Sequence, residues 1–210
     1  MGAGETPKHP PPSRYMASTV ANSAVDIAAR ALTLIGANPI TSFSDTSTEA
    51  TVANNMYEDV AQAALCASRW RFATNQAVLN LLTDAPTGRF DRAYQLPSDM
   101  LMLHALTVND LVVEYTVYGD KAYADLSATD QVVADYSFRA NEQDWPSYFT
   151  LTVEYQLAAI FASSIARDEA LTKMMDDKAS MLMAKARNLD SQQQTTRKLV
   201  TNRFRTERLS

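Results

Sequence analysis

The chain has 210 residues, of which 46% are hydrophobic and 20% are charged, and its formal net charge is −5. These values are ordinary for a soluble globular protein, and no apolar run approaches the roughly 18 residues that span a bilayer, so we expect no membrane segment. Cys66, the one cysteine, cannot form a disulfide within the chain, and we expect a small buried residue rather than a reactive thiol.

Residues 1–19 are predicted to form a disordered leader. They contain Gly2, Gly4 and a cluster of prolines at positions 7 and 10–12, and they lack the apolar core of a signal peptide. That composition is typical of disordered segments. Met16 is either an older start of the chain or the end of an added leader.

Residues 20–73 are predicted to hold two helices, over 22–35 and 48–69, because apolar residues recur there at helical spacing. Gly36 can end the first helix in a left-handed conformation, and Pro39 prevents its easy continuation.

The second helix closes at an aromatic segment, Trp70-Arg71-Phe72-Ala73. We expect Trp70 and Phe72 to be buried anchors between the helices and the region that follows, because rings of this size stabilise a fold most when they leave water.

Residues 74–143 are predicted to be β-rich. Asn109-Asp110 and Gly119-Asp120 are turn signals, and Pro97 marks the end of another apolar run. Strands are expected in the apolar or alternating stretches 77–82, 90–96, 101–108, 111–118, 121–124 and 132–138.

Residues 144–190 return to a helical pattern. Trp145-Pro146 is a plausible opening, since proline fits the first turn of a helix, and we expect Trp145 to anchor the return of the chain. A last helix is predicted over 168–190, with a methionine-rich face that is typical of adaptable packing. The fold class expected is therefore α+β but mainly α: an antiparallel bundle of about four helices with an inserted antiparallel β region and flexible termini.

Residues 191–210 form a basic arm. Its five basic residues stand against Glu207 alone, a net charge of +4, while the other 190 residues carry −9. A basic arm on an acidic body indicates docking to something acidic, which could be nucleic acid, a partner protein or a neighbouring copy. The basic residues are Arg197, Lys198, Arg203, Arg205 and Arg208.

No catalytic or metal-binding motif is found. His9 and His104 are the two histidines, and neither has companions at metal-ligand spacing. No phosphate-binding glycine loop and no nucleophile elbow occurs. We expect no catalytic residue, no cofactor and no metal, and we do not expect an enzyme.

Sequence-specific DNA binding is disfavoured in the first two helices. The 38 residues from Ala31 to Ser68 contain no lysine or arginine, whereas a recognition helix needs basic or amide side chains to meet phosphates and bases.

The order of these elements resembles the head-to-tail adaptor, or connector, family of tailed bacteriophages, and is similar to the tail tubular protein A family of short-tailed phages. The resemblance covers roughly residues 20–190. It depends on the order and spacing of the following segments: Ile35-Gly36 with Pro39-Ile40, Ser42-Phe43-Ser44-Asp45, Trp70-Arg71-Phe72-Ala73, Tyr94-Gln95-Leu96-Pro97-Ser98-Asp99 and Trp145-Pro146.

The resemblance implies a structural virion protein at the head–tail interface, assembled in the host cytoplasm. Copies would form a twelve-subunit ring beneath the portal protein, with the β region towards a tail nozzle or another downstream tail protein. DNA would pass through the channel without sequence-specific binding. The family has no catalytic residues to transfer, and both chain ends depart from its pattern.

Within this reading, we expect the arm to dock on the portal through Arg197, Lys198, Arg203, Phe204 and Arg205. The structural anchors expected are Gly36, Pro39, Trp70, Phe72, Pro97 and Trp145. The alternative function is a helical regulatory or ligand-binding domain, which would need a buried polar pocket.

Overall fold

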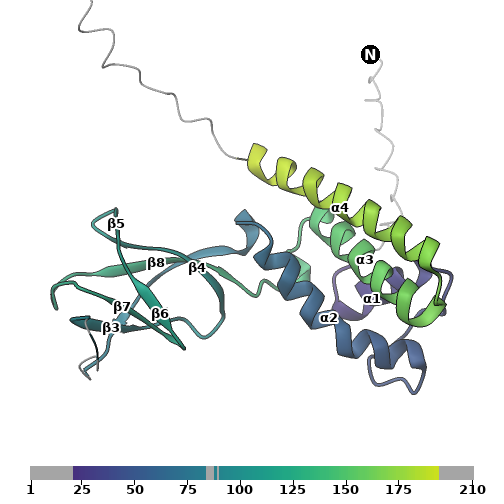
Figure 1. The fold of residues 1–210 in the computed structure, drawn as a ribbon, viewed down its shortest axis with the longest axis horizontal. Helices are drawn as coiled ribbons and strands as arrows, with labels where there is room; N and C mark the ends of the chain where they lie inside the picture. Colours follow the sequence, from purple (N-terminus) through teal and green to yellow (C-terminus); the bar gives the residue numbers. More distant parts are fainter. Residues whose placement is uncertain (1–20, 84–87, 89, 194–210) are drawn as a thin grey trace, which may run out of the picture.

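The computed structural model describes residues 21–83, 88 and 90–193. The described chain is elongated, with a helical part at one end and a β part at the other (Figure 1). The β part is formed by the chain between the second and third helices.

The helical part contains α1 (Ala24–Leu34), α2 (Thr48–Cys66), α3 (Ser147–Phe161) and α4 (Glu169–Gln192). These bounds agree with the helices expected from the sequence. The central helix is α3, which contacts each of the other three, and α4 lies along one side of it with α2 on another (Figure 1).

Local signals explain where these helices begin and end. The side chains of Ser23, Ser47 and Asp168 each accept a hydrogen bond from a backbone N–H in the first turn of α1, α2 and α4, which satisfies a donor that the helix leaves free. A π-helical turn, η3 (Ala162–Ala166), follows α3, and Arg167 then takes a left-handed conformation with φ 53° that allows the sharp return into α4.

Within the described residues, the β part has eight strands in two four-stranded antiparallel sheets, with orders β1-β8-β4-β5 in sheet A and β2-β3-β7-β6 in sheet B. A 3-10 turn, η1 (Arg71–Ala73), leads into it and another, η2 (Glu142–Asp144), leads out. The strands are β1 Thr74–Val78, β2 Asn80–Leu81, β3 Arg92–Gln95, β4 Met100–Val108, β5 Leu111–Val113, β6 Thr116–Tyr118, β7 Lys121–Ala124 and β8 Val132–Phe138.

Two short hairpin turns match the turn signals in the sequence. Asn109 and Asp110 both have positive φ, 50° and 65°, as the tight turn between β4 and β5 requires. Gly119, with φ 62°, lies in the turn between β6 and β7. This conformation costs glycine little free energy because it has no side chain.

The two sheets share a hydrophobic core of their own. Leu106, Val132 and Tyr136 of sheet A pack in one cluster with Tyr94 and Ala122 of sheet B. The helices enclose a separate core. Each part therefore has an apolar interior that its own elements build.

The expected fold class, a mainly helical bundle with an inserted β region, is wrong. Of the described residues, 48% lie in helices and 22% in strands, and the chain is α+β with four helices and two complete sheets. The sequence did not reveal the two sheets because stretches 77–82 and 111–118 were each expected to form one strand. In the structure each stretch is interrupted, and its two halves belong to different sheets.

The first and last strands of the β part pair with each other. Thr74 of β1 lies opposite Ser137 of β8, and the pairing continues to Val78 opposite Val133. Both covalent connections between the two parts therefore leave sheet A side by side, at the end that faces the helices (Figure 1).

Candidate interaction surfaces

A cluster of four aromatic rings lies where the chain leaves the helices and where it returns. The ring of Phe149 on α3 is 5.1 Å from Trp70, 4.9 Å from Phe72 and 4.9 Å from Trp145, centroid to centroid, in edge-to-face arrangements. Trp70 is fully buried and Trp145 is 5% exposed, whereas Phe72 is half-buried. The structure thus brings three of the aromatic residues expected to be anchors onto one helix.

The indole N–H of each tryptophan also has a hydrogen-bond acceptor. The indole N–H of Trp70 donates to the carbonyl of Ala64 at 2.9 Å, and that of Trp145 donates to the carbonyl of Ala140 at 3.0 Å. A buried indole without such an acceptor would lose free energy.

Arg139 joins the β part to the helices through a network of charges. It follows β8 and donates to both oxygens of Glu58 on α2, at 2.8 and 3.0 Å, and to Glu142 at 2.6 Å. Its guanidinium carbon lies 5.4 Å from the centre of the Trp145 ring, and the hydroxyl of Tyr57 donates to Glu142 at 3.1 Å.

The network sets the protonation of its members. Burial lowers the pKa of Arg139, but its hydrogen bonds with Glu58 and Glu142 outweigh this and raise the pKa overall. The hydrogen bond from Arg139 lowers the pKa of Glu58. Burial, with the nearby charge of Glu142, raises the pKa of Tyr57. Each carboxylate in the network has Arg139 as its oppositely charged partner, as buried charges at a structural junction require.

Asp190 fixes the last turns of α4 to the same junction. Its carboxylate, 5% exposed, accepts from the backbone N–H of Arg71 at 3.2 Å and from the hydroxyl of Tyr148 at 2.9 Å. Burial and this hydrogen bond raise the pKa of Tyr148 to about 12. Gln193, the last described residue, reaches the same hydroxyl, so the basic arm starts from this point.

The arm itself cannot be placed. Arg197, Lys198, Arg203, Phe204 and Arg205, expected to dock on the portal, lie outside the described residues.

The remaining anchors expected from the sequence are turn residues. Gly36 has φ 75°, and the N–H of Ala37 bonds to the carbonyl of Leu32 at 3.0 Å, the pattern of a left-handed helix end. Pro39 is exposed. The carbonyl of Pro97 accepts from the N–H of Met100 in the turn before β4.

An open cleft of about 620 Å³ lies beside the junction, lined by Arg69, Arg71 and Asp135, among others. Arg69 is 3.2 Å from Asp135, whose other oxygen accepts from Gln76 at 2.6 Å, and the side chain of Arg71 donates to the backbone carbonyl of Asp190 at 3.1 Å. The cleft therefore presents paired polar groups rather than a free acid or base.

His104 and the acidic residues form no metal site in the part of the chain that the structure describes. No group of three or more His, Cys, Asp or Glu side chains is close enough there to hold an ion. His104 lies on β4 and exchanges a hydrogen bond with the hydroxyl of Ser137 at 2.8 Å, and burial lowers the pKa of its ring.

One helical segment of the described chain, Ser147–Ala166, is long and apolar enough to cross a membrane by length and composition. The sequence reading missed this segment. Of its apolar window, 56% is buried inside the protein, because it is the central helix of the helical part, and a core helix passes the same test.

Large apolar side chains are exposed at the outer end of sheet A. Leu111 and Val112, directly after the β4–β5 turn, are 72% and 73% exposed, and Val78 at the end of β1 is 55% exposed. We call these three residues the tip surface. β5 is a three-residue edge strand in which Val113 packs against the core of the β part, whereas Leu111 and Val112 stay exposed.

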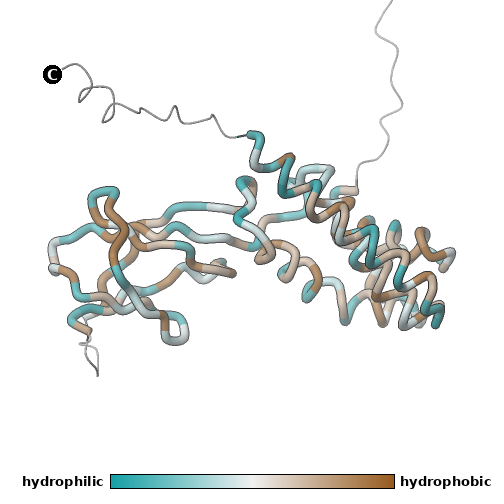
Figure 2. The backbone as a smooth tube through the Cα atoms, turned by 45° about the horizontal axis from the view of Figure 1, so that its top comes forward, coloured by the Kyte–Doolittle hydropathy of each residue, from teal (hydrophilic) through white to brown (hydrophobic). Residues whose placement is uncertain are grey.

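A second exposed apolar surface runs along α4. Met174, Met181 and Leu189 are 45%, 65% and 41% exposed, and Lys178 and Lys185 lie between them at the same helical spacing. We call these five residues the α4 stripe. Hydrophobic and hydrophilic residues alternate along this long helix (Figure 2).

The sequence grouped Met174 with Met175 on one face of this helix, and that grouping is wrong. Met175 is 4% exposed and belongs to the core, because adjacent residues of a helix point about 100° apart. The signal that could have separated them is the lysine spacing, which marks the solvent side of α4.

Comparison with known proteins adds no relative. No protein-family model matches the chain, and a search of curated proteins finds no match.

Proposed function

We propose that this chain is a structural protein of a bacteriophage particle: a head-to-tail adaptor that joins the portal protein to the tail and continues the DNA channel. The observation that carries the proposal is the pair of exposed apolar surfaces, the tip surface on the β part and the α4 stripe on the helical part. They lie on different parts of an elongated molecule (Figure 1).

Exposed apolar groups of this size indicate contact with other proteins. Covering one such side chain contributes roughly 1.5–3 kcal/mol, and clustered apolar residues on a surface usually mark interaction sites. Two such surfaces on separate parts let one chain contact different neighbours at the same time, as an adaptor must.

The roles of the parts follow from the resemblance stated above. In this proposal the β part faces the downstream tail protein and contacts it through the tip surface. Copies form a closed ring, of twelve subunits by the resemblance, through the helical part. The basic arm docks on the portal through Arg197, Lys198, Arg203, Phe204 and Arg205.

Charge supports a channel that DNA crosses without adhering. The described chain has no basic residue from Ala31 to Ser68, and the first turn of α2 carries Glu49. Like charge weakens contact with phosphates, so DNA can slide past such a surface.

The proposal is tested with purified full-length protein and the portal protein of the same phage. Native mass and negative-stain images should show closed rings of this chain on the portal. A monomer or dimer that ignores the portal and responds to a small ligand would instead favour a regulatory or ligand-binding domain.

Two variants separate the proposed contacts. Deleting residues 194–210, which leaves Asp190 and its partners in place, should abolish portal binding. Replacing Leu111 and Val112 with Asp should keep portal binding and reduce attachment of the downstream tail protein at least tenfold. Met102→Asp is the matched control, since Met102 is 42% exposed but lies at the opposite end of sheet A, paired with Ser137.

A further inference from the structure

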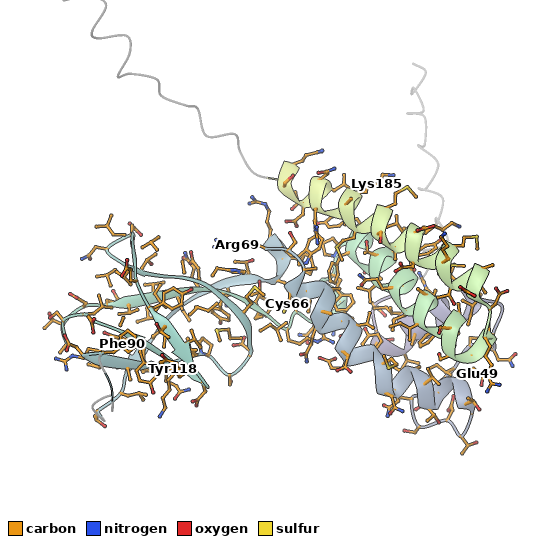
Figure 3. The ribbon with its side chains drawn as sticks, viewed as in Figure 1. Glu49, Cys66, Arg69, Phe90, Tyr118 and Lys185 are labelled. Atoms are coloured by element: carbon orange, nitrogen blue, oxygen red, sulfur yellow. The ribbon has the colours of Figure 1, made fainter. Side chains whose placement is uncertain are left out.

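The three apolar side chains of the α4 stripe are exposed, and two lysines lie between them. Three apolar side chains alternate with Lys178 and Lys185, and the nearest acid on the same side, Asp177, lies at the edge of the stripe. The Nζ of Lys178 lies 5.7 Å from the centre of the Tyr155 ring on α3, which holds this lysine against the helical part. Figure 3 shows Lys185 on the side of α4 that faces away from α2.

A second uncovered stripe runs along α2, and its charge is opposite. Val52, Asn55, Asp59, Gln62 and Cys66 recur at helical spacing and each is exposed or half-buried, and Val52 also packs against the edge of the helical core. We call them the α2 stripe. No basic residue occurs anywhere on α2.

The two stripes match in direction and height. Both helices run towards the β part (Figure 1), and the guanidinium of Arg187 on α4 donates to the carbonyl of Ala67 at the end of α2 at 3.0 Å. Counting back five residues from this contact places Gln62 level with Leu182, next to Met181, and counting back eight places Asp59 level with Ala179, next to Lys178.

We propose that the α4 stripe of one copy packs against the α2 stripe of the next copy. The inference deepens the proposed function, because it supplies the contact by which the copies form a ring. The contact joins two different surfaces, so each copy keeps one free α4 stripe and one free α2 stripe, and the chain of contacts continues until it closes.

Charge selects this pairing over the symmetric ones. An α4 stripe against a second α4 stripe would bring lysines together, and like charges in an interface suppress pairing. Two α2 stripes would offer no basic partner to Asp59, the single acid of that stripe. Between unlike stripes, the lysines of the α4 stripe meet Asp59, the one acid of the α2 stripe, while the methionines cover Val52 and the aliphatic part of Gln62.

Site-specific cross-linking of the full-length protein tests the inference. In a Cys66→Ser background, Gln62→Cys and Met181→Cys are made separately, mixed in equal amounts with portal protein, and oxidised. The mixture should give a cross-linked dimer, neither variant alone should, and a chain with both cysteines should give a ladder. The control pair Gln62→Cys with Met102→Cys should give no product.

Charge reversal gives a second readout. Lys178→Glu with Lys185→Glu should weaken association of copies at least tenfold, and mixing this protein with an Asp59→Lys, Gln62→Lys chain should restore it. Cross-linking of Met181→Cys with itself, or rings on the portal without a mixed dimer, would overturn the inference and leave the adaptor function standing. A ladder of cross-linked copies in protein that does not bind the portal would support the contact between stripes and contradict the adaptor function.

Discussion

The guanidinium of Arg139 holds both carboxylate oxygens of Glu58, with Nε 2.8 Å from Oε1 and Nη2 3.0 Å from Oε2. The two residues are 81 positions apart in the chain. One follows the last strand and the other lies on α2, so this pair fixes the β part against the helical part.

Replacing Arg139 with Met should lower the free energy of unfolding by about 1.5–3 kcal/mol, because Glu58 and Glu142 lose their charged partner within the network. Urea denaturation measures the change. Arg69→Met is the matched control: the Arg69 side chain is 53% exposed, against 23% for Arg139, and loss of its ion pair should cost less than about 1 kcal/mol. Equal losses in the two variants would contradict the role of Arg139.

Replacing Asp190 with Ala should free the last turns of α4. The N–H of Arg71 and the hydroxyl of Tyr148 lose a charged acceptor, which should cost about 1.5–3 kcal/mol. Hydrogen exchange of the Arg71 amide should become faster. Asp177→Ala, at an exposed position of the same helix, should change stability by no more than about 0.5 kcal/mol and leave this amide protected.

Replacing Trp70 with Ala should be among the most damaging changes in the helical core, with a loss of about 3–5 kcal/mol. The fully buried ring contacts Phe72 and Phe149 and would leave a large cavity. Phe72→Ala should cost clearly less, because Phe72 is half-buried. Thermal unfolding followed by circular dichroism ranks the two variants, and the reverse order would refute this account of the cluster.

Replacing Glu154 with Gln should stabilise the protein at neutral pH. Burial raises the pKa of this carboxyl above its ordinary value of 4.5, although Arg30, at 3.8 Å, partly lowers it. The folded state then binds its proton more tightly than the unfolded state, so stability falls as pH rises from the ordinary value through the folded one.

Denaturation at pH 4, 5.5 and 7 checks this expectation. The advantage of Glu154→Gln should be largest at pH 7 and disappear towards pH 4, where the native carboxyl is itself protonated. Asp59→Asn, at an exposed position, should show no such trend. An advantage that is independent of pH would mean that Glu154 acts through packing rather than through its charge.

The helices were predictable because their signals are local. Apolar spacing, the Gly36 stop and the serine caps all act within a few residues. Trp70 could likewise be read as a buried anchor from its position at the end of a helix. Strand β8 was also recognisable from its own alternation over 132–138.

The arrangement of the strands was not predictable in this way. The alternation over 111–118 indicates that successive side chains face opposite sides of a strand. It does not indicate that the chain passes from one sheet to the other at Glu114 and Tyr115. The pairing of β1 with β8 joins residues about 60 positions apart, and no local pattern records it.

The contacts at the junction could not be predicted from the sequence for the same reason. Asp190 and Arg71 are 119 positions apart, and each one alone reads as an ordinary charged residue of a helix or a turn. The tip surface was not predicted because an apolar residue in a strand is expected to be buried. Only the position of β5 at the edge of its sheet shows that Leu111 and Val112 are exposed.

The side-by-side exit of β1 and β8 has a mechanical consequence. Force that pulls the tip away from the helices enters both strands at the same end and in the same direction, at Thr74 and Ser137. The two strands then share the tension, and the hydrogen bonds between them are neither sheared nor opened one after another. Two connecting strands that carry tension together suit a protein that transmits force along its long axis.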